Sequence, residues 1–178
     1  MSEGLTPAYR IFNSTNPGDW GTVPGSYVDS SWNATMIDSN ANGYRLPTEA
    51  QWEYAAKGGN GSPGNYTYSG SNNPDEVVWY AVNSSDMTHE VGAKAPNGLG
   101  IYDMSGNVHE WCWDFYGSYS SEAQTDPVGA SSGSYRVVRG GWFPQQPEFI
   151  RSAHRNYYYP SSGHITGGFG FRVVRPMN

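Results

Sequence analysis

Hydrophobic positions follow a helical period in one stretch, residues 46–58. Apolar side chains recur there with the i, i+3, i+4 spacing of a helix face, at Trp52, Ala55 and Ala56. Thr48, with Gln51 three residues further on, has the pattern of a capping box. The sequence therefore predicts one helix here, about ten residues long.

Alternation with period two indicates the strands. Residues 108–115 alternate between polar or small side chains and an aromatic face, and residues 135–139 and 168–175 are predicted as two further strands. A short strand is also expected at residues 9–12, and an apolar run at 77–80 is expected to be buried. The remaining stretches are polar and rich in turn residues: 1–44, 59–75, 116–134 and 142–167. This pattern favours an α+β fold with short mixed strands, few helices and much loop.

Composition narrows the functional class. The chain has 178 residues, the size of one domain, with 23 Gly and 12 Pro, which disfavours a helical bundle. Its net charge is −6 with only ten Lys and Arg, so nucleic acid is not expected as a partner. No apolar run approaches the ~20 residues of a membrane-spanning helix. The single Cys112 excludes an intrachain disulfide and a multi-cysteine metal site.

Three blocks occur in an order that resembles a known family. They are YRLPTEAQWEYAA at residues 44–56, GIYDMSGNVHEW at 100–111, and the motifs RGG at 139–141, RSA at 151–153 and GFR at 170–172. The chain resembles the formylglycine-generating-enzyme, or sulfatase-modifying-factor, family over roughly residues 43–175. The resemblance implies a divergent C-type-lectin fold. It further implies one domain over residues 1–178 without the family's N-terminal hairpin and first helix, which another segment or chain would supply.

Oxidase members of that family use a cysteine pair between the RGG and GFR motifs, where thiolates hold copper and engage the substrate. This chain has no Cys between Gly141 and Phe171, and Ser152 stands where Cys is common in relatives. Cys112 lies between two Trp in a predicted strand and is expected to be packed rather than reactive. The resemblance therefore favours a protein that does not catalyse. An enzyme with altered, cysteine-independent oxidative chemistry is the alternative.

A structural calcium ion is one interpretation of residues 103–110. Hard cations take carboxylate and carbonyl oxygens, and relatives use matching positions for Ca²⁺. The ligands would be the carboxylates of Asp103 and Glu110 with the carbonyls of Gly106 and Val108. The alternative is that Asp103 caps a turn and Glu110 pairs with an arginine. No cofactor is required by either interpretation.

Four arginines stand among apolar or small residues: Arg139, Arg151, Arg155 and Arg172. A guanidinium taken into a core needs a carboxylate partner to offset its desolvation. Glu53, Glu110 and Asp114 are the candidate partners. We expect these arginines to be structural.

Residues 142–167 have the composition of a recognition surface. Tyr157, Tyr158 and Tyr159 are flanked by Ser, Gly and Asn, a mixture that supplies rigid contact area and adaptable hydrogen bonds. The alternative is that these rings cover the core. The segment also resembles the variable region of diversity-generating-retroelement proteins of the treponemal type. The matching positions, our predicted ligand-binding residues, are Gln145, Gln146, Glu148, Phe149, His154, Asn156, Tyr157, Tyr158, Tyr159, Ser162, His164 and Thr166.

The sequence is thus interpreted as a ligand-binding variable protein on a C-type-lectin scaffold. The expected partner is a protein or another surface macromolecule. An extracellular or cell-surface location is favoured by the family resemblance. A purely structural subunit of a larger complex is a third interpretation.

Overall fold

A computed structural model describes residues 4–24, 32, 34–60, 65–160 and 167–176. Contacts group the chain into two compact units, residues 1–46 with 173–178 and residues 47–172. The expectation of one domain over residues 1–178 stays a prediction. No helix within the described ranges is long and apolar enough to cross a membrane.

The smaller unit contains a two-stranded antiparallel sheet. Strand β1 (Tyr9–Arg10) pairs with β2 (Met36–Ile37), so the strand expected at residues 9–12 forms in its first half. It stops where Phe12 takes a positive φ of 51° and turns outward. A 3-10 turn, η1 (Pro17–Asp19), follows and is capped by the Asn16 side chain. Towards the end of the chain, Val174 exchanges two backbone hydrogen bonds with Arg45.

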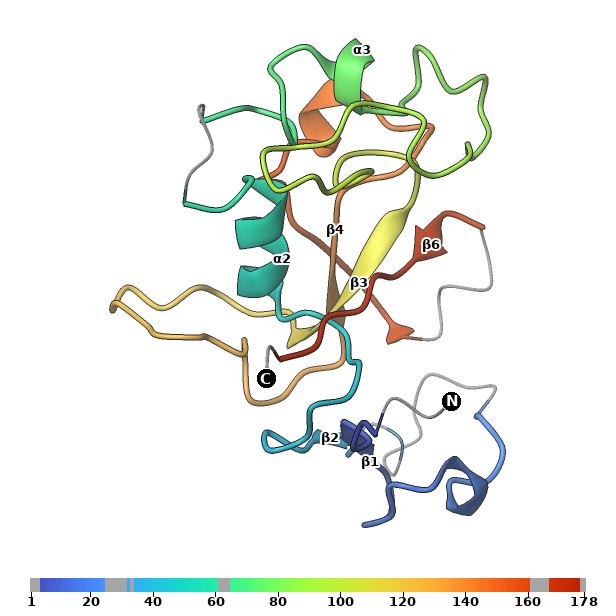
Figure 1. Cartoon of the computed structure of the whole chain (residues 1–178), viewed down its shortest axis with the longest axis vertical. Coiled ribbons are helices and arrows are strands. Elements are labelled where there is room, and N and C mark those ends of the chain that lie inside the picture. Colours follow the sequence, from blue (N-terminus) through green and yellow to red (C-terminus); the bar gives the residue numbers. More distant parts are fainter. Residues whose placement is uncertain (1–3, 25–31, 33, 61–64, 161–166, 177–178) are drawn as a thin grey trace. The chain divides into compact units, whose positions relative to one another are not determined.

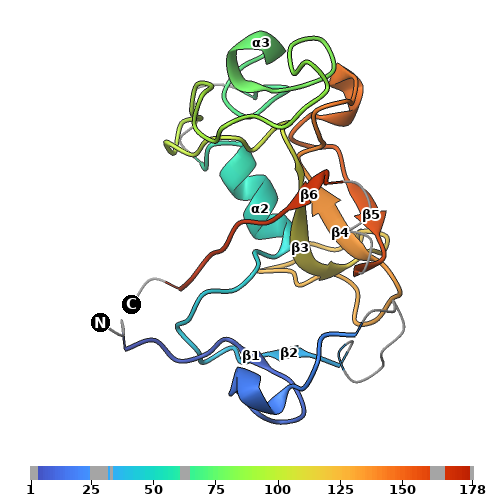
Figure 2. The same ribbon diagram turned by 90° about the vertical axis from the view of Figure 1, so that its right-hand side faces the viewer.

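The larger unit is built on a four-stranded sheet in the order β5-β4-β3-β6 (Figures 1 and 2). Strands β3 (His109–Phe115) and β4 (Arg136–Arg139) are antiparallel and confirm two of the predicted strands. Strand β5 (Asn156–Tyr158) pairs antiparallel with β4, and β6 (Phe169–Gly170) pairs parallel with β3. The sheet is therefore mixed, with strands as short as the sequence suggested.

Two strand predictions were wrong. The strand expected over residues 168–175 covers only Phe169–Gly170, because Arg172 turns its side chain to Glu110 and Val174 pairs with Arg45. Residues 142–167 were expected to be irregular, yet β5 lies within them. Its three residues are too few to display a period along the sequence.

The predicted helix is α2 (Glu49–Ala56), which packs against β3 and β4. The capping box is present. The backbone N–H of Gln51 donates to Thr48 Oγ1 at 3.2 Å, and the backbone N–H of Thr48 donates to Gln51 Oε1 at 3.1 Å. Trp52 and Ala56 are fully buried and form one core cluster, whose other members are Met104, Cys112 and Val137. The helix thereby packs the face that carries Trp52 and Ala56 against β3 and β4.

A second cluster lies beneath the loops of residues 66–105. It contains the run expected to be buried at residues 77–80, in which Val77, Val78 and Tyr80 are at most 5% exposed. A single-turn helix, α3 (Pro74–Val77), is capped by Asn73 and ends at the first residue of that run. Tyr68 and Ile150 complete the cluster.

Ion pairs join α2 to the sheet and confirm that three of the four arginines are structural. Arg139 of β4 is completely buried and contacts both Glu49 and Glu53, at 3.1 and 2.6 Å. Arg155 pairs with Glu49 through two nitrogens, at 2.9 and 2.6 Å. Glu49, which sequence reasoning overlooked, is therefore the carboxylate that both arginines share.

The other two arginines differ from each other. Arg172 pairs with Glu110 through two nitrogens, each at 2.6 Å. Arg151 is exposed, and its Nε donates to the Glu148 carbonyl. Asp114, expected as an arginine partner, instead accepts the Glu49 backbone N–H at 2.8 Å.

Removing one partner of this network should destabilise the protein strongly. We expect Arg139→Met to lower the free energy of unfolding by about 3–5 kcal/mol, because Glu49 and Glu53 would lose a buried cation. As the matched control, Lys57→Met removes the exposed cation that also contacts Glu53 and should change stability by less than about 1 kcal/mol. Urea unfolding of both variants measures the difference. Equal effects would contradict the assignment.

Candidate functional site

Five of the predicted ligand-binding residues line one open hollow of about 510 Å³. They are Gln145, Gln146, Phe149, His154 and Asn156, and the hollow also includes Pro144 and Arg155. Its volume lies within the ~300–1,000 Å³ common for ligand sites. The structure therefore gathers part of the segment's polar and aromatic residues into one concave surface.

The chain reaches this hollow through a tight turn. Gly141 has φ of +72°, and a Cβ there would meet Ile150 Cγ2 at 2.4 Å and the Phe149 carbonyl at 2.8 Å. Only glycine therefore allows residues 142–150 to fold back on themselves. The Gln145 side chain closes the turn by accepting the Trp142 N–H at 3.2 Å.

A 3-10 turn, η2 (Pro147–Phe149), presents the outer wall. Phe149 is 44% exposed and meets the His154 ring edge-on, with centroids 5.5 Å apart. Gln146 and Glu148 beside it are exposed. A solvent-exposed ring next to exposed amide and carboxylate groups is suited to contact a macromolecular surface.

The three tyrosines do not form a single patch. The Tyr157 ring lies tilted against Tyr116 and edge-on to Tyr135, with centroids 4.2 and 4.9 Å away, and the Tyr159 ring lies 4.4 Å from that of Tyr135. Tyr158 points to the opposite face of the sheet, as the alternation of a strand requires. The expected contact surface therefore includes Tyr157 and Tyr159, which are 43% and 39% exposed. Ser162, His164 and Thr166 lie outside the described residues.

Tyr158 instead joins an aromatic cluster on the other face, which sequence reasoning did not foresee. Its ring lies 4.8 Å from Phe169 and 5.7 Å from His109, and Trp142 lies 6.2 Å from His109. Trp142 fits because a Cβ at Gly168 would stand 2.1 Å from its ring, so only glycine allows this packing. Tyr158 therefore follows the alternative interpretation from the sequence, in which a tyrosine ring covers the core.

The carboxylate proposed for calcium is already engaged. Glu110 holds Arg172 with both oxygens, and its Oε2 also accepts the Trp52 indole N–H at 2.6 Å. Asp103 takes a positive φ of 58° and accepts the Gly92 N–H at 2.7 Å. No cluster of three or more His, Cys, Asp or Glu suited to a metal occurs in the described part of the chain. This arrangement fits a cation only if Glu110 leaves Arg172, and the calcium site stays a prediction.

Cys112 is packed, as expected. It is 1% exposed within the α2 core cluster, and burial raises the pKa of its thiol well above the ordinary value. Thiols react as thiolates. This buried side chain therefore stays a neutral thiol, which suits it to packing rather than to nucleophilic or redox chemistry.

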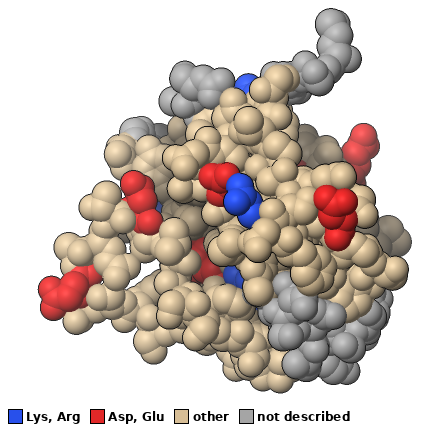
Figure 3. Space-filling view, turned by 90° about the horizontal axis from the view of Figure 1, so that it is seen from below, with Lys and Arg blue, Asp and Glu red and all other residues tan. Residues whose placement is uncertain are grey.

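Basic side chains do not gather into a patch on the face shown in Figure 3. Within its described part, Lys and Arg stand singly among uncharged and acidic residues. Such a face offers no continuous positive surface for a phosphate backbone.

The buried His109 predicts a specific pH dependence. Neither ring nitrogen makes a well-formed hydrogen bond within the described residues, although the Arg139 backbone lies nearby. Burial lowers the pKa of His109 to about 4. As pH falls from about 6.5 to 4, the unfolded chain takes up a proton that the folded protein refuses, so stability drops by about 3 kcal/mol.

His109→Phe should remove that drop, because phenylalanine has no proton to gain. Urea unfolding of both proteins between pH 7.5 and 4 gives two stability profiles. Other titrating groups, including Asp114, remain in both proteins and cancel in the difference. Parallel profiles would contradict the assignment.

Comparisons with known proteins agree with this fold. The family model described as the sulfatase-modifying factor enzyme 1-like domain matches residues 15–177. The chain is 40% identical to the chaperone protein LppX of Paenibacillus barcinonensis, over 98% of this chain and 63% of that protein. It is 35% identical to the formylglycine-generating enzyme of Streptomyces coelicolor, over 83% of this chain and 51% of the enzyme.

A solved structure is also similar. The Treponema denticola variable protein 1 superposes with a TM-score of 0.83 and 36% identity, over 97% of this chain and 63% of that one. This chain therefore spans less than two thirds of the length of these relatives.

Proposed function

We propose that this chain, which belongs to the sulfatase-modifying factor enzyme 1-like domain family, is a ligand-binding protein that displays a variable surface and does not catalyse. The observation that carries the proposal is the hollow formed by Gln145, Gln146, Phe149, His154 and Asn156. Gln146 and Phe149 project as exposed side chains from a segment whose backbone is fixed by Gly141 and Arg155, and the other three are partly exposed. A fixed backbone with exposed side chains is the arrangement that recognition surfaces use.

The likeness to Treponema denticola variable protein 1 supports this function. Its name describes a variable protein, and the superposition covers 97% of this chain. The exposed positions of the segment are the ones whose replacement would cost little stability. We propose a protein or another surface macromolecule as the ligand, an extracellular or cell-surface location, and no nucleic-acid partner.

Enzyme chemistry is the second candidate, because relatives include formylglycine-generating enzymes. Ser152 occupies the position where the resemblance places a thiol, and it is 2% exposed with no hydrogen-bond partner for its Oγ in the described structure. A serine hydroxyl is a poor ligand for copper, which prefers thiolates. The site as built thus supports binding better than oxidation.

Sequences of the gene from several isolates would test variability. We expect substitutions at Gln146, Phe149, Tyr157 and Tyr159, which are exposed. Ile150 and Ser152 belong to the same segment but are buried, so they serve as internal controls and should not change. Substitutions spread equally over buried and exposed positions, or none at all, would contradict a variable surface.

Because this chain has no cysteine pair between the RGG and GFR motifs, we expect it not to oxidise a cysteine-containing peptide. A cysteine-containing peptide incubated with this protein, copper and oxygen should keep its mass, because no thiolate pair is present to hold the metal. The Streptomyces coelicolor enzyme is the positive control. Conversion of the peptide cysteine to an aldehyde, together with stoichiometric copper in the purified protein, would establish the enzyme alternative.

A further inference from the structure

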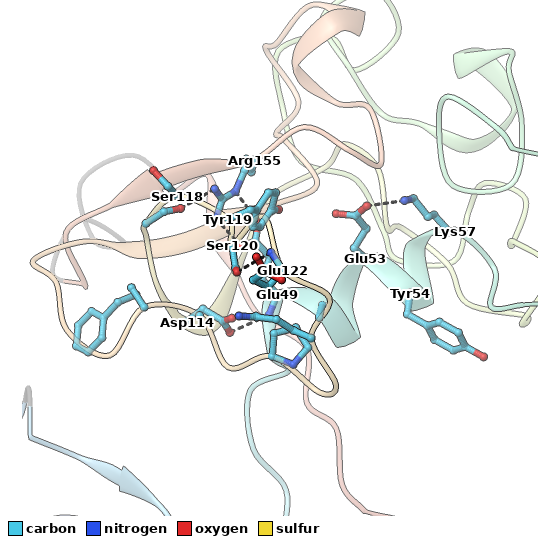
Figure 4. Close-up of a pocket in the computed structure, with 17 residues that line it drawn as sticks. Glu49, Glu53, Tyr54, Lys57, Asp114, Ser118, Tyr119, Ser120, Glu122 and Arg155 are labelled. Carbon is cyan, nitrogen blue, oxygen red and sulfur yellow. Dashed lines mark hydrogen bonds and ion pairs between the residues drawn. The ribbon is translucent and has the colours of Figure 1, made fainter.

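A second cavity lies apart from the predicted ligand-binding residues, along α2 from Glu49 to Lys57 (Figure 4). Its volume is about 670 Å³, and its wall combines α2, the end of β3 and the loop of residues 117–130. Neither the sequence motifs nor the proposed recognition surface account for it. Its size suits a small ligand or one long side chain.

The charges in this cavity are only partly balanced. Glu49 is paired with Arg139 and Arg155, and Glu53 with Arg139 and Lys57. Asp114 also lines the cavity, is 2% exposed, and forms no ion pair within the described residues. A carboxylate so deeply buried normally has a cation beside it, because an uncompensated buried charge is costly.

The environment of Asp114 shows that cost. Backbone N–H groups, that of Glu49 among them, and the positive charge of Arg136 favour its ionised form. Burial, together with the negative charge of the nearby Glu49 carboxylate, outweighs them and raises the pKa of Asp114 to about 6. The carboxylate is therefore still ionised at neutral pH while it lacks a paired cation. A positively charged group that entered the cavity would relieve this penalty.

The cavity wall already holds one cation between an aromatic ring and a carboxylate, which are the contacts that a positively charged ligand would need. The Arg155 guanidinium lies 4.0 Å from the centre of the Tyr119 ring and pairs with the Glu49 carboxylate. Tyr119 remains 64% exposed, so much of its surface is available to a ligand. Glu122 supplies a second carboxylate on the wall without an ion pair in the described structure (Figure 4). A ring beside carboxylates is the combination that recognises organic ammonium groups.

We propose that this cavity binds an organic ammonium group, with its charge held by Asp114 and Glu122 and its carbon chain against the Tyr119 ring. Two sources carry such a group: a free alkyl amine and a lysine side chain of a protein partner. The site does not depend on the proposed recognition surface. It stands or falls separately, because only Arg155 lines both hollows.

Chemical-shift mapping with three probes tests the site. The probes are cadaverine, acetyl-Gly-Lys-Gly-amide, and acetyl-Gly-norleucine-Gly-amide as the uncharged counterpart. We expect saturable shifts of the backbone amides of Glu49, Tyr119 and Glu122 with at least one amine, and none with the norleucine peptide. Tighter binding of the lysine peptide would assign a protein partner, and tighter binding of cadaverine a free amine. No shifts with either amine, or equal shifts with the norleucine peptide, would overturn the proposal.

Two variants locate the charge. Asp114→Asn keeps an oxygen for the Glu49 N–H but removes the charge, so amine affinity should fall by about tenfold or more. Glu122→Gln alters an exposed residue, leaves the fold untouched and should weaken binding severalfold. Glu90→Gln removes an exposed carboxylate that lines neither this cavity nor the recognition surface, and should leave binding unchanged. Undiminished affinity in Glu122→Gln and in a folded Asp114→Asn would contradict the proposed contacts.

Discussion

The carboxylate of Glu49, shared between Arg139 and Arg155, is the interaction on which the arrangement of the larger unit depends. Glu49 lies in the first turn of α2, Arg139 on β4, and Arg155 immediately before β5. Their side chains are 6%, 0% and 20% exposed, so the charges are largely removed from water. Such a network holds only when its geometry is satisfied throughout. It therefore fixes where the helix, the central strands and the recognition segment meet.

Local signals predicted the elements that are stabilised locally. The capping box of Thr48 and Gln51 lies within four residues, and the alternation of β3 extends over seven. Strand β6 was predicted too long because residues 171–175 continue with the aromatic and β-branched side chains that strands favour. The pairing of Arg172 with Glu110, 62 residues away, ends the strand earlier. A contact at that separation leaves no trace in a local pattern.

The same reasoning explains what was predicted of the site. The composition of residues 142–167 indicated recognition, and five residues of this segment do share one hollow. Which face each tyrosine takes depends on β5 pairing with β4, which no short window of sequence reveals. Glu49 lies in the first turn of α2, next to the capping box, and nothing in its local sequence indicates a buried role. Its partner Arg155 lies 106 residues further along the chain, so its central role emerges only in three dimensions.

Arg155, which anchors the recognition segment, immediately precedes β5, from which the exposed side chain of Tyr157 projects. Arg155 is held by Glu49 and by the Gly117 carbonyl, and β5 begins at the next residue with three backbone partners on β4. The backbone of this segment is thus set by Arg155 and by pairing with β4, to which the exposed Tyr157 side chain does not contribute, while the Asn156 side chain accepts the Tyr157 N–H at 2.8 Å. Tyr158 is the exception because its ring packs on Phe169 and His109. The surface can therefore change its chemistry at outward positions without disturbing the sheet, provided that the inward ring and the buried guanidinium stay in place.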